Sequence, residues 1–93
     1  MVEYFPLPGS ALQDVDTPAL LIDLPKFEQN MNKVADFYRD REAKVRPHIK
    51  GHKCPEIAHL QLDAGGTVGG VCAAKLGEAE AMVHGGIRQV LIF

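Results

Sequence analysis

Short apolar runs alternate with amphipathic stretches along this chain, and this alternation constrains the fold more than any other feature. The apolar runs lie at residues 19–23, 67–73 and 89–93. The stretches between them carry apolar residues at helical spacing and are interrupted at Gly65-Gly66 and Gly85-Gly86. Strands and helices that alternate with short connections form parallel sheets with right-handed crossovers. The sequence therefore predicts an α/β fold.

Three helices are expected. Pro25 opens the first helix and Pro55 the second, because proline is favoured in the first helical turn. Glu78 and Glu80 lie near the positive end of the third. The apolar residues expected to face inward are Phe27, Met31, Val34 and Tyr38 in the first helix, Ile57, Leu60 and Ala64 in the second, and Leu76, Ala79 and Val83 in the third.

Length and charge limit the classes of protein to consider. The 93 residues allow one small domain, and the net charge of −2 leaves no electrostatic footprint for nucleic acid. The apolar runs are too short to cross a bilayer, and the first residues do not resemble a signal peptide. We therefore expect a cytoplasmic protein with no membrane or nucleic-acid partner. Cys54 and Cys72 are then expected to be reduced thiols, with Cys72 serving in packing.

The segment Arg46–Cys54 carries the most chemistry. If residues 44–50 are extended, Arg46, His48 and Lys50 share one face, and the apolar side chains point to the other. A lysine that is partly desolvated and surrounded by cations loses its proton more readily. Such an amine is a nucleophile that forms Schiff bases with carbonyl compounds or pyridoxal phosphate. Lys50, at the end of the expected strand, is therefore the candidate catalytic residue.

Two other interpretations of this segment remain open. The charges could form a solvated surface, which is the commonest role of a charge cluster. His48, His52 and Cys54 could also bind a metal, although no second ligand pair of the zinc-module kind occurs elsewhere in the sequence.

The glycine-rich segment Gly65–Gly70 is not a phosphate-binding loop. The dinucleotide fingerprint needs its glycines between a strand and the following helix, whereas these lie between a helix and the following strand. A helix stop and close backbone packing explain them.

Three blocks of sequence resemble a known family. They are residues 16–24 (Asp-Thr-Pro-Ala-Leu-Leu-Ile-Asp-Leu), residues 46–58, which begin Arg-Pro-His-Ile-Lys-Gly-His-Lys-Cys-Pro, and residues 75–80 (Lys-Leu-Gly-Glu-Ala-Glu). The chain is similar to D-threonine aldolase and its relatives, pyridoxal-phosphate enzymes with a barrel like that of alanine racemase. The resemblance covers residues 15–93, and the Arg-Pro-His-x-Lys-x-His-Lys block is its specific part.

The resemblance implies roles for individual residues. The lysine two residues after the histidine of Arg-Pro-His carries the cofactor in this family, which is Lys50 here, with His48 as a further cofactor contact. Lys53 is the rival, but it follows Gly51, where the strand is expected to end. Two positions differ from close D-threonine aldolases: Gly51, and the residue before Lys75, which is not a glutamine. These differences concern the substrate more than the cofactor.

The resemblance also implies a fold that is larger than this chain. It is a (β/α) TIM-type barrel, the N-terminal domain of alanine racemase-like enzymes, and about three of its eight strands would be present. Residues 1–15 would be an N-terminal lead and residues 16–93 the first part of the barrel domain. The strand at 19–23 would join a second, β-rich domain. The chain ends on Val90-Leu91-Ile92-Phe93 without a polar tail, as a truncated barrel would.

The implied activity is a lyase reaction that cleaves D-3-hydroxy amino acids into glycine and an aldehyde. Alternatives are a D-serine or D-3-hydroxyaspartate dehydratase, an amino-acid racemase of the same fold, or a non-catalytic α/β fragment. The family implies a homodimer and a divalent metal, Mn²⁺ or Mg²⁺, whose ligands would come from later sequence. We expect residues 1–93 alone to be inactive and prone to associate through unpaired strand edges.

Overall fold

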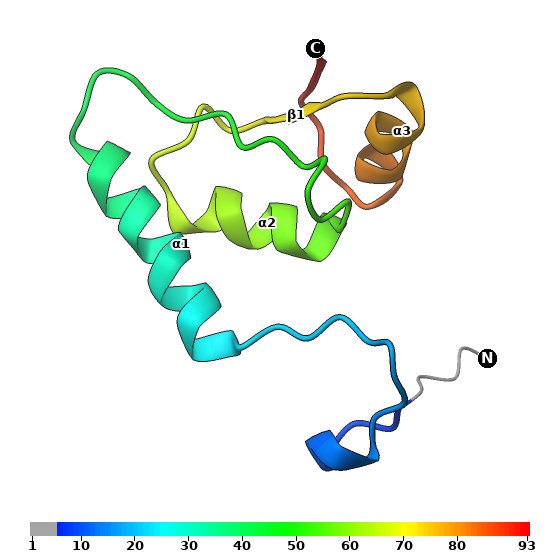
Figure 1. Cartoon of the computed structure of the whole chain (residues 1–93). Helices are drawn as coiled ribbons and strands as arrows, with labels where there is room; N and C mark the ends of the chain where they lie inside the picture. Colours follow the sequence, from blue (N-terminus) through cyan, green and yellow to red (C-terminus); the bar gives the residue numbers. More distant parts are fainter. Residues whose placement is uncertain (1–5) are drawn as a thin grey trace.

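The computed structural model describes residues 6–93, and its helices and strands alternate from residue 55 onward (Figure 1). No helix in this range is long and apolar enough to cross a membrane. In chain order the elements are a 3₁₀ turn at Leu12–Asp14, α1 at Leu24–Arg39, α2 at Pro55–Ala64, β1 at Val71–Ala73, α3 at Leu76–His84 and β2 at Val90–Ile92.

The strands form a small parallel sheet with β1 at its centre. On one side β1 pairs with β2, with Cys72 opposite Leu91. On the other side it meets the segment that ends at Lys50, through a parallel bridge between His48 and Cys72. A second parallel bridge joins Val45 to Thr67. The prediction of an α/β chain with adjacent parallel strands is therefore confirmed for these residues.

The predicted strand at 67–73 is wrong in its first half. His48 is three positions after Val45, but its partner Cys72 is five positions after Thr67, the partner of Val45, so the two segments cannot stay in register. The extra length forms a bend at residues 68–70, where Gly69 takes a φ of +85°. Only Val71–Ala73 remains as a regular strand. The predicted strand at 44–50 is extended as far as Ile49, whereas Lys50 already belongs to a turn, and the extended part touches its neighbour at isolated bridges only.

The predicted strand at 19–23 is also absent from the described structure. These residues adopt no regular structure, and Leu20 is fully exposed. Figure 1 shows this part of the chain, blue to cyan, running away from the helices and the sheet. A strand requires a hydrogen-bonded neighbour, and no segment within residues 6–93 lies beside it to provide one.

The core lies between the sheet and helices α2 and α3. Its largest fully buried side chains are Ile49, Val71 and Met82. The whole cluster consists of Ile49, Ala58, Val71, Ala73, Ala79, Met82 and Ile87, with Leu62 and Val90 at its margin. The bounds of the helices agree with the sequence prediction: α1 has Asp23 as its N-cap, accepting from the N–H of Lys26, and a proline lies in the first turn of α1 and of α2.

All three predicted helix faces are wrong in detail. In α1 Val34 is exposed, and Ala35 is buried instead. Leu60 of α2 is exposed, and Ala58 and Leu62 face the core instead. In α3 Ala79 is buried as expected, but Leu76 and Val83 are exposed and Met82 takes the central place. The final strand was expected to be buried, yet Leu91 and Ile92 are half-exposed and Phe93 is 85% exposed. Helical spacing constrains which residues share a face, but the neighbouring elements decide which face is covered.

Gly85 lets the end of α3 approach the start of α2, which yields a test of the packing. A Cβ at Gly85 would overlap the ring of Pro55, whereas a Cβ at Gly77 meets nothing within 4 Å. We expect Gly85→Ala to destabilise the chain by about 1–3 kcal/mol through overpacking. Gly77→Ala, inside α3, should stabilise it by up to about 1 kcal/mol through helix propensity. Urea unfolding followed by circular dichroism measures both, and equal shifts in the same direction would contradict this packing.

Candidate functional site

Lys50 lies in a tight turn that directly follows the extended segment. The backbone N–H of Lys53 donates to the carbonyl of Ile49 at 2.7 Å, and this bond closes the turn. Ile49 is fully buried in the core and anchors the turn, whereas Lys50 is exposed. Lys53 has a φ of +52° and is the one residue other than glycine with a positive φ among the described residues.

Burial alternates along the segment as the sequence predicts. Pro47 and Ile49 are buried, while Arg46 and His48 are half-buried. The polar residues therefore alternate with those that pack into the core. The expected desolvation of Lys50 is not observed, because its side chain is open to solvent in the described structure.

Both histidines of the segment hold backbone groups in place. The Nδ1 of His48 accepts from the N–H of Lys50 at 3.2 Å. The Nδ1 of His52 accepts from the N–H of Cys54 at 2.9 Å, so its neutral ring carries the proton on Nε2 and donates to Gln61 Oε1 at 3.0 Å. His52 is thus a structural residue that ties the turn to α2.

These contacts disfavour the metal-site interpretation of the segment. The thiol of Cys54 donates to the Glu56 carboxylate, and both ring nitrogens of His52 already have partners. Within residues 6–93 no group of three His, Cys, Asp or Glu side chains could hold a metal ion.

The Arg46 guanidinium lies close to Gly70, the residue before β1. A Cβ at Gly70 would lie 2.5 Å from a guanidinium nitrogen of Arg46 and 2.7 Å from Gln89 Cβ. Glycine at position 70 therefore leaves the space that the Arg46 guanidinium and Gln89 occupy. Sequence reasoning expected close backbone packing at these glycines but did not identify the side chain that requires it.

Glu78 is the residue that sequence reasoning missed most clearly. It was placed at the positive end of α3, but its side chain, only 9% exposed, also reaches the turn of Lys50. One carboxylate oxygen accepts from the N–H groups of Ala74 and Lys75 at 2.8 and 3.0 Å. The other lies 3.8 Å from Lys53 Nζ. The position of Glu78 near the positive end of the helix could be predicted from the sequence, but its hydrogen bonds to Ala74 and Lys75 and its partner Lys53 were not predicted.

Backbone hydrogen bonds from Ala74 and Lys75 lower the pKa of Glu78 below its ordinary value of 4.5, and the nearby Lys53 ammonium acts in the same direction. Glu78 is therefore an anion at neutral pH. The negative charge is fixed beside the turn that carries Lys50.

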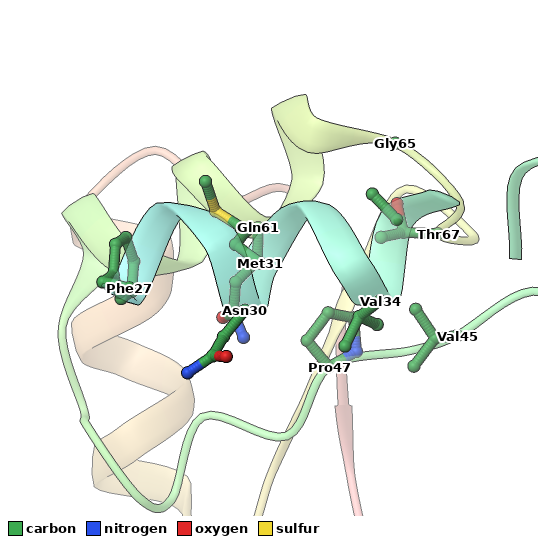
Figure 2. A pocket seen from close by; sticks show the side chains of 10 residues that line it. Phe27, Asn30, Met31, Val34, Val45, Pro47, Gln61, Gly65 and Thr67 are labelled. Atoms are coloured by element: carbon green, nitrogen blue, oxygen red, sulfur yellow. The ribbon is translucent and has the colours of Figure 1, made fainter. Parts of the chain in front are cut away.

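An apolar cavity of the described structure lies away from this site. It has a volume of about 310 Å³ and lies between α1, α2 and the start of the extended segment (Figure 2). Figure 2 shows Val45 and Pro47 lining it, which belong to the face opposite Lys50. Its lining is mainly apolar and contains no titratable side chain; the residues are Phe27, Asn30, Met31, Val34, Ala35, Val45, Pro47, Gln61, Gly65 and Thr67.

Comparison with known proteins identifies the relatives of this chain. It is 41% identical over 86 residues to 3-hydroxy-D-aspartate aldolase from Paracoccus denitrificans and 42% identical over 85 residues to D-threonine aldolase from an Arthrobacter species. The crystal structure of D-threonine aldolase from Filomicrobium marinum matches 87% of the chain with a TM-score of 0.80 and 53% sequence identity. The resemblance to the D-threonine aldolase group is confirmed.

The match covers most of this chain but little of its relatives. The alignments span 92% and 91% of the chain, yet only 22% of each of the two aldolases, and 21% of the solved structure. D-serine dehydratase from Schizosaccharomyces pombe is also similar, at 41% identity over 59 residues. No family model matches the chain.

The lowered pKa of Glu78 generates a test of this arrangement. A carboxyl group whose pKa is lowered on folding stabilises the protein above its unfolded-state pKa, and that stability is lost as the pH falls through the folded-state pKa. Glu78→Gln keeps an oxygen that can accept from Ala74 and Lys75 but removes the charge. We expect the wild type to be more stable than the variant at neutral pH and the difference to shrink below about pH 4.

Urea unfolding at a series of pH values measures this difference. Glu80→Gln is the matched control, since Glu80 lies on the same helix with an exposed side chain. A difference between the wild type and Glu78→Gln that stays constant down to about pH 2 would contradict the role of the charge.

Proposed function

We propose that this chain forms part of a pyridoxal-phosphate-dependent lyase that cleaves D-3-hydroxy amino acids into glycine and an aldehyde, with Lys50 as the residue that carries the cofactor. The observation that carries the proposal is the position of Lys50. It is an exposed lysine in the turn after an extended segment that runs parallel to β1. In open and closed parallel sheets alike, ligands bind at the carboxyl ends of the strands.

The surrounding contacts favour Lys50 over Lys53 as the cofactor-bearing residue. The Nζ of Lys53 donates to the carbonyl of Lys50 at 2.6 Å and faces Glu78. Lys50 Nζ makes no hydrogen bond or ion pair to any other described residue. A covalent bond to a cofactor aldehyde needs an accessible amine, and Lys50 meets that requirement without giving up another contact.

The described residues fit one end of the cofactor only. Lys50 provides the covalent attachment, and His48 lies beside it as a contact to the cofactor or its ring. The N–H groups of Ala74 and Lys75, at the start of α3, already bind Glu78 and are not available for a phosphate. The phosphate and pyridine-nitrogen contacts are therefore assigned to parts of the barrel beyond these residues, as are the ligands of a divalent metal.

In the proposed mechanism Lys50, His48 and Arg46 have separate roles. Bound pyridoxal phosphate supplies an electron sink for carbon–carbon bond cleavage. Lys50 would hold the cofactor through its amine, and as a free amine it would hold or return a proton. His48 accepts from the Lys50 N–H through Nδ1, which leaves its neutral ring with a proton on Nε2 to donate. Arg46 adds a fixed positive charge on the same face.

The proposal includes the remaining architecture. Residues 16–93 would be the first part of a TIM-type barrel, with residues 1–15 as a lead, and the cytoplasmic enzyme would act as a homodimer on small molecules. A dehydratase is the second candidate, because D-serine dehydratase and D-threo-3-hydroxyaspartate dehydratase are among the relatives. The products separate the two: a dehydratase releases ammonia, and an aldolase releases glycine.

The position of the cofactor can be tested in a full-length barrel. In the chimera, this chain replaces the matching segment of D-threonine aldolase from Filomicrobium marinum. Borohydride reduction in the presence of pyridoxal phosphate should fix the cofactor to the peptide that contains Lys50, as mass spectrometry would show. Lys50→Ala should abolish both this label and the cleavage of D-threonine while changing stability by less than about 0.5 kcal/mol, because the side chain is exposed.

Lys75→Ala is the matched control, since Lys75 is exposed in the next loop and should leave the label in place. A label on the peptide of Lys53 or Lys75 in the wild-type chimera would overturn the assignment of Lys50. Release of ammonia in place of glycine would favour the dehydratase and leave the assignment of Lys50 unchanged.

A further inference from the structure

We infer that Lys53 and Glu78 form a brace that positions Lys50, in which the Lys53 ammonium holds the Lys50 carbonyl and Glu78 holds the ammonium. This inference rests on the proposed function of Lys50 and assigns positioning roles to two residues that do not touch the cofactor. It starts from four connected contacts. Lys53 Nζ donates to the Lys50 carbonyl at 2.6 Å and lies 3.8 Å from Glu78 Oε1, and Glu78 Oε2 accepts from two backbone N–H groups.

The brace joins two loops at the same edge of the sheet. The turn that carries Lys50 follows the extended segment, and the connection at residues 74–75 follows β1, its direct neighbour. Glu78 is attached to the second loop by its hydrogen bonds to Ala74 and Lys75. Through Lys53 it therefore limits the movement of the backbone of Lys50 relative to the central strand.

The ion pair alone is not the source of this effect. Lys53 is 61% exposed, and an exposed ion pair contributes little to stability because water screens it. The restraint comes from the two partners of the Lys53 ammonium, the Glu78 carboxylate and the Lys50 carbonyl. Glu78 is nearly buried and hydrogen-bonded to backbone, and the bond to the Lys50 carbonyl is charge-assisted and short.

The backbone of Lys53 indicates that its side chain is needed at this position. A φ of +52° is unfavourable for a residue with a Cβ, and glycine would adopt it without strain. A turn that needed only its backbone shape would be better formed by glycine. A lysine in this conformation directs its ammonium back to the carbonyl three residues earlier.

The same contacts separate the two lysines of the turn by function. Lys53 is engaged with the Lys50 carbonyl and Glu78, while the Lys50 side chain is left accessible for covalent chemistry. A catalytic lysine must be held in a productive geometry by neighbours that are themselves fixed. Lys53 and Glu78 meet this description because Glu78 is fixed to the start of α3.

The test uses the chimera with variants of Lys53 and measures attachment of the cofactor directly. Lys53→Met removes the ammonium and keeps the length of the side chain, and Lys33→Met, at an exposed position of α1, is its matched control. Lys53→Gly removes the ammonium and the backbone strain together, so weaker attachment cannot be attributed to a strained turn. Lys53→Arg keeps the charge and the donors.

We expect Lys53→Met and Lys53→Gly to lower the affinity for covalently bound pyridoxal phosphate by about ten-fold, the usual cost of one charge-assisted hydrogen bond. The borohydride label should also spread from Lys50 to other lysines. Lys53→Arg should restore most of the affinity, and Lys33→Met should behave like the wild type. Hydrogen exchange at residues 50–53 should be faster in the Met and Gly variants than in the wild type. Glu78→Gln should also increase the exchange rate there, but by less.

The outcomes separate this inference from the proposed function. If the wild-type chimera carries the label on Lys50 and Lys53→Gly matches it in affinity, label position and exchange, the brace is overturned and the proposed function stands. If the wild-type chimera carries no label on Lys50, the proposed function fails and the brace fails with it. Loss of affinity in Lys53→Arg equal to that in Lys53→Met would also overturn the brace.

Discussion

The structure depends on hydrogen bonding along both edges of one short strand. Cys72 of β1 donates to the carbonyl of Pro47 on one side, and Val71 donates to Gln89 on the other. These bonds hold the extended segment, β1 and β2 side by side and parallel. The connections that follow, including the turn of Lys50, consequently lie at the same edge of the sheet. Buried Ile49 then attaches that turn to the core.

The polar groups of the site that already have hydrogen-bond partners limit the chemistry available there. The backbone at this edge is held by side chains: His48 and His52 accept N–H groups of the turn, and Glu78 accepts those of the next loop. Lys53 is held between Lys50 and Glu78, so the exposed amine of Lys50 is the one left available. Aldolases and dehydratases similar to this chain act on hydroxy amino acids according to their names.

Local signals in the sequence were sufficient to predict the helices and the alternation at Lys50. Pro25, Pro55 and the pair Gly85-Gly86 bound elements where the structure has them. The bend at residues 68–70 and the exposure of Leu60 were not predictable in this way, because each depends on the register or position of a neighbouring element. The contact between Lys53 and Glu78 depends on the same sheet geometry, and neither residue alone indicates the other. The position of Lys50 could be predicted from the sequence, but its supporting residues could not.

A crystal structure of the cofactor-loaded chimera tests the central claim most directly. We expect continuous electron density between pyridoxal phosphate and Lys50 Nζ, with Lys53 still hydrogen-bonded to the Lys50 carbonyl and facing Glu78. Density that joins the cofactor to Lys53 or Lys75, or a Lys50 side chain turned toward the helices, would contradict it.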